Sequence, residues 1–207
     1  MSVLINASTS TGLVQSADTS GEIELQSNGT TALKVNTNEG IQILNCLGVG
    51  NATPSTSGAG ITFPATQSAS TDANTLDDYE EGTWTPVVAF GGNAVAQTGN
   101  LTGLYTKIGN IVTISCYIGL SAKGSSTGDA QVRGLPFTIN SADGAYIAVA
   151  LYLANVTVTD YPIAFGIVNT TRIYLAEATN AGVSTPLTNA DFANNSEVMV
   201  NLTYRVA

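Results

Sequence analysis

The chain has 207 residues, enough for one ordinary domain with an appendage. Its 15 acidic residues outnumber 6 basic ones, and the net charge of -9 disfavours binding to nucleic acid or to anionic lipid. The sequence contains no histidine, which excludes imidazole bases, serine or cysteine triads of the usual kind and His-ligated zinc or haem.

Only 10% of the residues are charged, while Ser, Thr, Gly and Asn are abundant, and this composition predicts an all-β chain. The first eleven residues lack the basic and apolar regions of a signal peptide, and no window approaches 18 consecutive apolar residues. We therefore expect synthesis in a cytoplasm and no membrane insertion. Cys46 and Cys116 have no CxxC companions, so we interpret both as plain buried thiols.

Residues 1–50 are expected to form a β-rich arm or stalk. From Gly21 to Leu44 the apolar residues fall on odd positions, which predicts short strands with one apolar face. Asn28-Gly29 and Asn38-Glu39-Gly40 are expected to form the turns between them. Such a face needs either the downstream domain or other chains to cover it; we favour other chains, which makes six residues candidates for assembly: Ile23, Leu25, Leu33, Val35, Ile41 and Ile43.

Residues 51–81 are expected to be a linker that ends in an acidic turn. The stretch 51–75 is rich in Ser, Thr, Gly and Ala and predicts an extended segment. Charge also changes here, because residues 1–81 carry nine acidic residues and one lysine, whereas 82–207 carry six acidic and five basic residues.

Residues 82–207 are expected to form an antiparallel β-sandwich knob, jelly-roll-like, because strand signals recur at regular spacing. The expected strands are 83–90, 103–108, 111–120, 130–133, 146–153, 163–168, 172–177 and 197–206. Gly109-Asn110 and Asn169-Thr170 predict hairpin turns.

Three finer expectations concern individual segments of the knob. Alternation from Val112 to Ile118 points Cys116 into the core. The segment 146–153 is apolar on both faces, which indicates either a central strand or a subunit interface. Thr185-Pro186 followed by 187–192 predicts a helix of one or two turns.

Two segments are candidates for chemistry or recognition. The acidic cluster Asp77–Glu81 before Trp84 is interpreted as a solvated turn, with a paired-carboxylate glycosidase and a calcium loop as alternatives. The polar loop 121–129 is either an ordinary hairpin connection or a recognition loop, with Lys123, Ser125, Ser126 and Asp129 as its candidate residues. Neither segment predicts a catalytic residue, a cofactor or a metal site.

The string LDDYEEGTWTP, residues 76–86, resembles a segment found repeatedly in predicted tail fibre and tail-fibre-like proteins of bacteriophages. The flanking strings are similar to the same proteins: GNATPSTSGAGITFPA (50–65), TGLYTKIGNIVTISCYI (102–118) and RGLPF (133–137). The resemblance implies a structural virion protein, usually trimeric, with a β-rich arm and a C-terminal sandwich, and it implies no catalytic residues.

Four functions follow as hypotheses. The first is a short homotrimeric tail fibre that contacts other tail proteins and a host-surface glycan. The second is a trimeric head decoration or cement protein, which clamps the major capsid protein through its acidic arm. A polysaccharide depolymerase that uses the acidic cluster and a carbohydrate-binding sandwich domain are the remaining two. The first two place the protein on the virion, at the tail or on the capsid surface.

Overall fold

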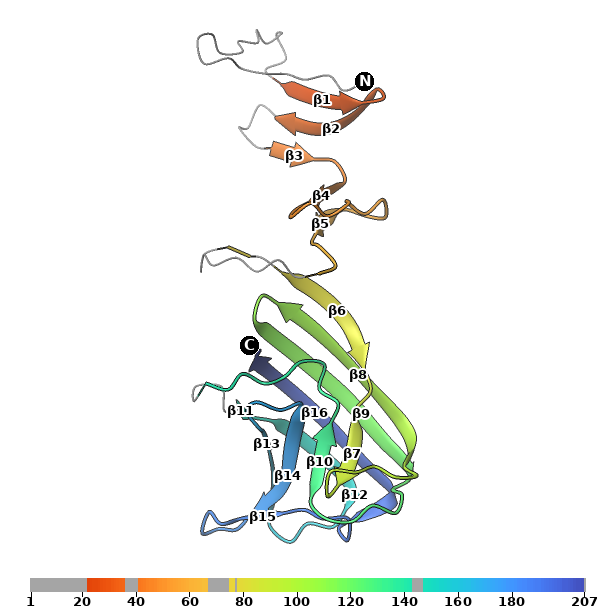
Figure 1. The fold of residues 1–207 in the computed structure, drawn as a ribbon, viewed down its shortest axis with the longest axis vertical. Coiled ribbons are helices and arrows are strands. Elements are labelled where there is room, and N and C mark those ends of the chain that lie inside the picture. Colours follow the sequence, from red (N-terminus) through yellow and green to blue (C-terminus); the bar gives the residue numbers. More distant parts are fainter. Residues whose placement is uncertain (1–21, 36–40, 67–74, 77, 143–146, 207) are drawn as a thin grey trace. The chain divides into compact units, whose positions relative to one another are not determined.

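The computed structural model describes residues 22–35, 41–66, 75–76, 78–142 and 147–206. The chain divides into two units, residues 1–68 and 69–207, which we call the N-terminal and the C-terminal unit (Figure 1). All regular secondary structure in the described part is β-strand, so the predicted all-β class is confirmed. The N-terminal unit contains β1 (Ile23–Ser27), β2 (Thr30–Val35), β3 (Ile41–Ile43), β4 (Cys46–Gly48) and β5 (Gly60–Thr62).

Strands β1, β2 and β3 form an antiparallel sheet in sequence order. The predicted turn at Asn28-Gly29 is confirmed, since both residues have positive φ, 51° and 73°; the turn expected at 38–40 lies outside the described residues. The register aligns the apolar side chains in two rows across the three strands. One row is Ile23, Val35 and Ile41, and the other is Leu25, Leu33 and Ile43.

Strands β4 and β5 form a separate parallel pair, in which Leu47 lies opposite Ile61. Strand β5 falls inside the segment that was expected to be an extended linker, so this part of the linker is paired. Backbone bonds extend the pairing, because the Val49 amide donates to the Thr62 carbonyl at 3.0 Å. Position 48 requires glycine, because a Cβ there would lie 2.2 Å from the Ala52 carbonyl oxygen.

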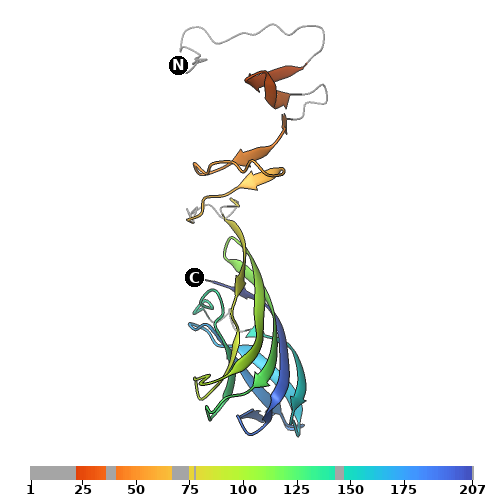
Figure 2. The ribbon, with the colours of Figure 1, turned by 90° about the vertical axis from the view of Figure 1, so that its right-hand side faces the viewer.

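The C-terminal unit contains two antiparallel sheets that share one core (Figures 1 and 2). The five-stranded sheet has the order β12-β16-β9-β8-β6, and the six-stranded sheet has the order β11-β13-β14-β10-β7 with β15 beside β14. The strands are β6 (Tyr79–Trp84), β7 (Val87–Phe90), β8 (Thr98–Ile108), β9 (Ile111–Ala122), β10 (Ala130–Arg133), β11 (Ile147–Ala148), β12 (Ala150–Val156), β13 (Tyr161–Gly166), β14 (Arg172–Ala178), β15 (Ser184–Pro186) and β16 (Phe192–Arg205).

The core lies between the inner faces of these two sheets. Ile114 and Val198 come from the five-stranded sheet, and Val132 and Ile173 come from the six-stranded sheet; all four are at most 1% exposed. Cys116 is buried in the same layer, as its place in the alternation predicted. The hairpin turns at Gly109-Asn110 and Asn169-Thr170 are also confirmed, with positive φ at Gly109 and Asn169.

Two predicted strands are each split between the sheets. The segment 83–90 was expected to be one strand, but Thr85-Pro86 separates β6 in the five-stranded sheet from β7 in the six-stranded sheet. The segment 146–153 was also expected to be one strand, but β11 and β12 belong to different sheets. Proline has no N–H to donate to a strand ladder, so Pro86 is well placed where the chain leaves the five-stranded sheet and enters the six-stranded one.

The prediction of a helix at 185–192 is wrong. Pro186 ends strand β15, where it lies opposite Ala176. The next residues form a turn in which the Thr188 amide donates to the Asp191 carboxylate at 2.7 Å and the Asp191 amide donates to the Thr188 carbonyl at 3.1 Å. Thr and Asp side chains cap turns with the same hydrogen bonds that cap helices, so the local pattern fits both structures.

Candidate functional site

The acidic cluster is a strand and not the turn expected from the sequence. Asp78 directly precedes β6, is only 3% exposed, and forms an ion pair with Lys107 of the neighbouring strand β8, which is equally buried. Glu80 accepts a hydrogen bond from the Tyr105 hydroxyl at 2.7 Å, and Glu81 accepts one from the Tyr79 hydroxyl. Asp77 lies outside the described residues.

These carboxylates do not form the arrangement that a glycosidase uses. A glycosidase places two carboxyl groups on opposite sides of a sugar-binding cleft. Here Glu80 and Glu81 are consecutive in a strand and point to opposite faces of the sheet, while Asp78 is occupied by Lys107. The cluster's described members therefore act as hydrogen-bond and ion-pair partners within the fold.

The buried ion pair belongs to a wider network at one end of the sandwich. The Lys107 ammonium lies 5.7 Å from the centre of the Phe137 ring, and Tyr105 packs edge-on against the same ring at 5.4 Å. The Tyr204 hydroxyl donates to the Phe137 carbonyl at 3.1 Å, and burial raises the pKa of Tyr204 to about 12. These contacts hold the connection after β10 against the five-stranded sheet.

Strands β6 and β8 also match aromatic side chains with glycines. Gly82 is paired with Tyr105, and Trp84 is paired with Gly103. A Cβ at Gly82 would lie 2.6 Å from the Tyr105 ring, and a Cβ at Gly103 would lie 2.3 Å from the Trp84 Nε1. Each glycine thus provides the space that the aromatic ring on the other strand occupies, which gives a physical reason for the residue types in EEGTW and TGLY.

The predicted recognition loop is held by structural hydrogen bonds. The Lys123 ammonium donates to the carbonyls of Asn189 and Phe192, both at 2.8 Å. Asp129 accepts a hydrogen bond from the Tyr174 hydroxyl, which raises the pKa of that tyrosine. The two charged candidates, Lys123 and Asp129, therefore already have hydrogen-bond partners within the fold.

Ser125 and Ser126 lie beside the loop between β7 and β8. The Ser125 amide donates to the Val95 carbonyl at 3.1 Å, and the Val95 amide donates to the Ser126 hydroxyl at 2.9 Å. A cavity of about 290 Å³ lies between the two loops, lined by Phe90, Asn93, Val95, Ser125, Ser126 and Thr127. Asn93 and Val95 could not be predicted as lining residues, because no local sequence pattern shows which distant loops meet.

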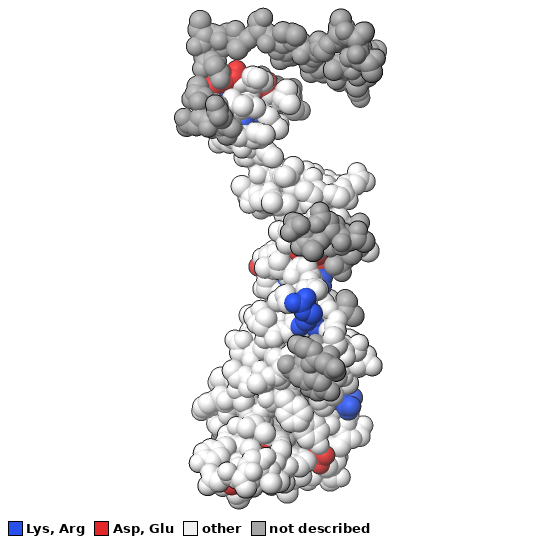
Figure 3. Space-filling model, turned by 90° about the vertical axis from the view of Figure 1, so that its left-hand side faces the viewer, with Lys and Arg blue, Asp and Glu red and all other residues white. Residues whose placement is uncertain are grey.

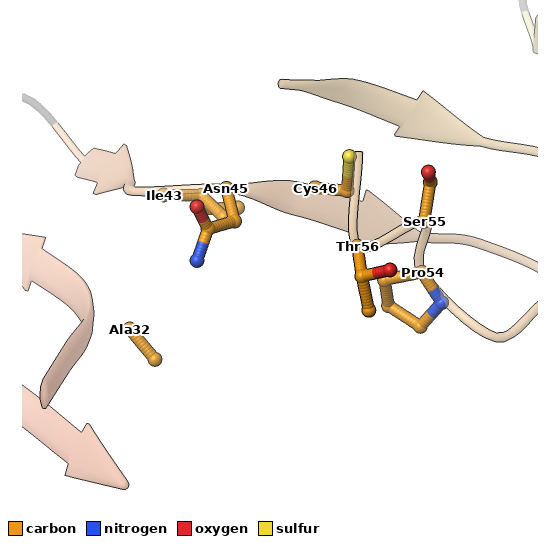
Figure 4. Close-up of a pocket in the computed structure, with 7 residues that line it drawn as sticks. All are labelled: Ala32, Ile43, Asn45, Cys46, Pro54, Ser55 and Thr56. Atoms are coloured by element: carbon orange, nitrogen blue, oxygen red, sulfur yellow. The ribbon is translucent and has the colours of Figure 1, made fainter. Parts of the chain in front are cut away.

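A second cavity, of about 390 Å³, lies in the N-terminal unit (Figure 4). It is lined by Ala32, Ile43, Asn45, Cys46, Pro54, Ser55 and Thr56, none of which is charged. Figure 4 shows that the Cys46 thiol and the Ser55 hydroxyl point to one side while the Asn45 amide points to the other. The polar groups do not converge, so the cavity offers shape and apolar surface but no catalytic constellation.

The candidate assembly residues lie on the β1–β3 sheet and are largely exposed in the single chain. Ile41 is 72% exposed and Leu25 is 53% exposed; Ile23 and Ile43 are also exposed, whereas Leu33 and Val35 are half-buried. No described residue of the N-terminal unit is buried. Exposed apolar surface of this extent is typical of interaction surfaces in proteins, so the assembly role of these residues stays a prediction.

The opposite face of this sheet is polar and paired. The Lys34 ammonium lies 2.6 Å from the Glu22 carboxylate and 3.7 Å from that of Glu24. Hydrogen bonds from Thr31 and Gln26 lower the pKa of Glu24. The sheet therefore has one face suited to solvent and one face suited to another apolar surface.

Within the described residues, no three Cys, Asp or Glu side chains gather as metal ligands would, and no helix could cross a membrane. The sequence matches no protein-family model and is not significantly similar to any curated protein.

We expect the two cysteines to differ in reactivity. Cys116 is buried, and burial raises the pKa of its thiol to about 11, so it is protonated and inaccessible at pH 8. In a Cys46→Ser variant, a thiol reagent at pH 8 should label nothing in the folded protein and one thiol after denaturation in urea. Rapid labelling of the folded variant would contradict the placement of Cys116 in the core.

Proposed function

We propose that this protein is a structural subunit of a bacteriophage virion, a short homotrimeric tail fibre that contributes to attachment to the host surface. The observation that carries the proposal is the β1–β3 sheet, whose two apolar rows are uncovered in a unit without a buried residue among those described. The assignment to the phage tail is supported by the resemblance of residues 76–86 to tail-fibre-like proteins.

A single sheet of three short strands cannot bury its own apolar face, so that face gains from contact with another apolar surface. Three copies related by a cyclic axis would turn their apolar rows toward one another and leave the paired Glu22, Glu24 and Lys34 face in solvent. Low charge and many small polar residues suit a chain whose surface is covered by its own copies. In this proposal the N-terminal unit is the assembly segment, and its other partners are tail proteins.

The end of the sandwich that carries the cavity of about 290 Å³ is the surface we assign to a host-surface glycan. Its lining has hydroxyl and amide groups together with the exposed side chain of Val95, and it has no charge. This mixture suits a neutral sugar, which presents both hydroxyl groups and C–H surfaces.

A head decoration or cement protein is the second candidate. It is favoured by the charge distribution, because residues 1–81 contain nine acidic residues and one lysine. An acidic segment of this kind would suit a basic surface on capsid subunits. In this alternative residues 1–81, which span the N-terminal unit and the start of the C-terminal unit, bind the major capsid protein, and the rest of the C-terminal unit faces outward.

Immunogold labelling of intact virions with antibody against the C-terminal unit separates these functions. Label confined to the tail supports the tail fibre, and label distributed over the head supports the cement protein. Absence of label from virions of a phage that encodes this chain would contradict both. Light scattering on the purified full chain tests the trimer independently, since a monomer at all concentrations would contradict it.

A further inference from the structure

We infer that the outer face of the five-stranded sheet in the C-terminal unit is a contact surface with a second copy of this chain; the inference deepens the proposed homotrimer and rests on it. By the outer face we mean the side chains of β6, β8, β9, β12 and β16 that point away from the core. This surface lies in a different unit from the β1–β3 sheet and is supported by separate observations.

The first observation is the amount of exposed apolar side chain on this face. Five of its large hydrophobic residues are 40–57% exposed: Leu104, Tyr152, Ile108, Tyr79 and Met199. The ladder places Tyr152, Met199 and Tyr117 side by side across three strands, and further along the same face it pairs Tyr79 with Ile108. Groups of exposed apolar residues on one face of a sheet indicate a surface that another protein covers.

The second observation is where the charges lie. Three charged residues lie on this face: Glu81 on the edge strand β6, Arg205 at the end of β16, and Glu197 within β16, two positions from Met199. The middle rows contain Thr, Ser, Asn, Tyr and aliphatic side chains, such as Thr113, whose hydroxyl lies 3.0 Å from that of Thr203. A face with few charges among polar and apolar side chains is suited to burial against another protein.

The other sheet also has exposed apolar side chains on its outer face, with Tyr161 at 63% and Phe165 at 38%, but it carries two adjacent like charges as well. On its outer face Arg133 and Arg172 lie directly opposite each other on β10 and β14, and neither has an ion-pair partner among the described side chains. Burying two adjacent like charges against another copy would be costly. The space-filling view from the opposite side to Figure 2 shows charged side chains as separate patches on a mostly uncharged surface (Figure 3). Of the two outer faces, the five-stranded one is thus suited to burial.

The third observation concerns strand β12. The two-sided apolar segment that includes β12 indicated either a central strand or an interface, and the structure places β12 at the edge of its sheet. Beside it is a hollow of about 380 Å³ whose lining includes Ala150, Tyr152, Met199 and Ser115. A central position is thus excluded, and the hollow is large enough to receive a side chain from a neighbouring copy.

The size of the face matches that of a subunit interface. Five strands spaced about 4.8 Å apart, with about eight residues of each strand at about 3.3 Å, present roughly 600 Å². A standard interface buries about 800 Å² on each partner. A second copy is the occupant to which we commit, because the face approaches the area that one subunit contributes to a standard interface between identical chains.

The test is the strength of self-association of the full chain. We expect a Leu104→Asp, Met199→Asp double variant to raise the protein concentration at which the trimer dissociates by at least tenfold, as measured by light scattering and sedimentation. The matched control is Tyr161→Asp, which changes an exposed aromatic residue on the other sheet and should leave association unchanged. Equal dissociation of the double variant and the wild type would overturn the inference.

A second measurement does not depend on the variants folding normally. A photoreactive benzophenone amino acid in place of Tyr152 should cross-link two chains to each other, and mass spectrometry should place the joined residues in the C-terminal unit of the second chain. Photoproducts confined to single chains would overturn the inference. Both readouts are independent of where the protein lies on the virion, so they can fail while the labelling result stands.

Discussion

Replacing Lys107 with methionine is expected to lower the free energy of unfolding of the C-terminal unit by about 3–5 kcal/mol, the usual effect of removing one partner of a buried ion pair. Methionine has similar length but no charge, so the Asp78 carboxylate would remain buried without its cation. The ring of Phe137 would also lose the ammonium that lies 5.7 Å from its centre. Urea denaturation at one fixed protein concentration measures the change.

The interpretation requires a double variant and a control. In Asp78→Leu, Lys107→Met both charges are removed, so this variant should lose less stability than Lys107→Met alone. Lys34→Met removes a half-buried lysine from the N-terminal unit and should leave the unfolding midpoint of the C-terminal unit unchanged. Additive losses in the double variant would show that Asp78 and Lys107 do not stabilise each other.

Local pattern was sufficient to predict most of the longer strands and several turns, because alternation and turn residues act over a few positions, but it missed β4, β5 and β15. The alternation around Cys116 identified its core-facing side chain, and Asn28-Gly29 identified a hairpin. Sheet membership depends instead on contacts between distant residues, so the splits at Thr85-Pro86 and between β11 and β12 were not predicted. Proline at position 86 was the available local signal for the first split.

The interactions around the acidic cluster also could not be predicted from the sequence. Asp78 and Lys107 are 29 positions apart, and only the register of β6 against β8 brings them together. Without that register, five adjacent polar residues look like a solvated turn. In the same way, the polar loop 121–129 has the composition of a mobile segment, yet Lys123 and Asp129 are fixed by partners more than 40 positions away.

The same register explains why glycine stands at positions 82 and 103. Neither glycine has the positive φ that would require glycine for backbone reasons, so the requirement is steric. Trp84 is 7% exposed, and its indole N–H donates to the Leu104 carbonyl at 3.3 Å. A methyl group at position 103 would lie 2.3–2.6 Å from three atoms of that indole, which is closer than any real contact. The ring must therefore move if position 103 carries a side chain.

Gly103→Ala is consequently expected to destabilise the C-terminal unit by about 1–3 kcal/mol, the usual cost of overpacking a core. Because Trp84 is the sole tryptophan, its fluorescence should shift to longer wavelength as the indole becomes exposed. Thr83→Ala, which alters an exposed residue next to Trp84, is the control and should leave both emission and stability near wild type. In a Trp84→Phe background the smaller ring leaves room for the methyl group, so Gly103→Ala should cost less there. An equal cost in both backgrounds would show that the glycine is needed for a reason other than the indole.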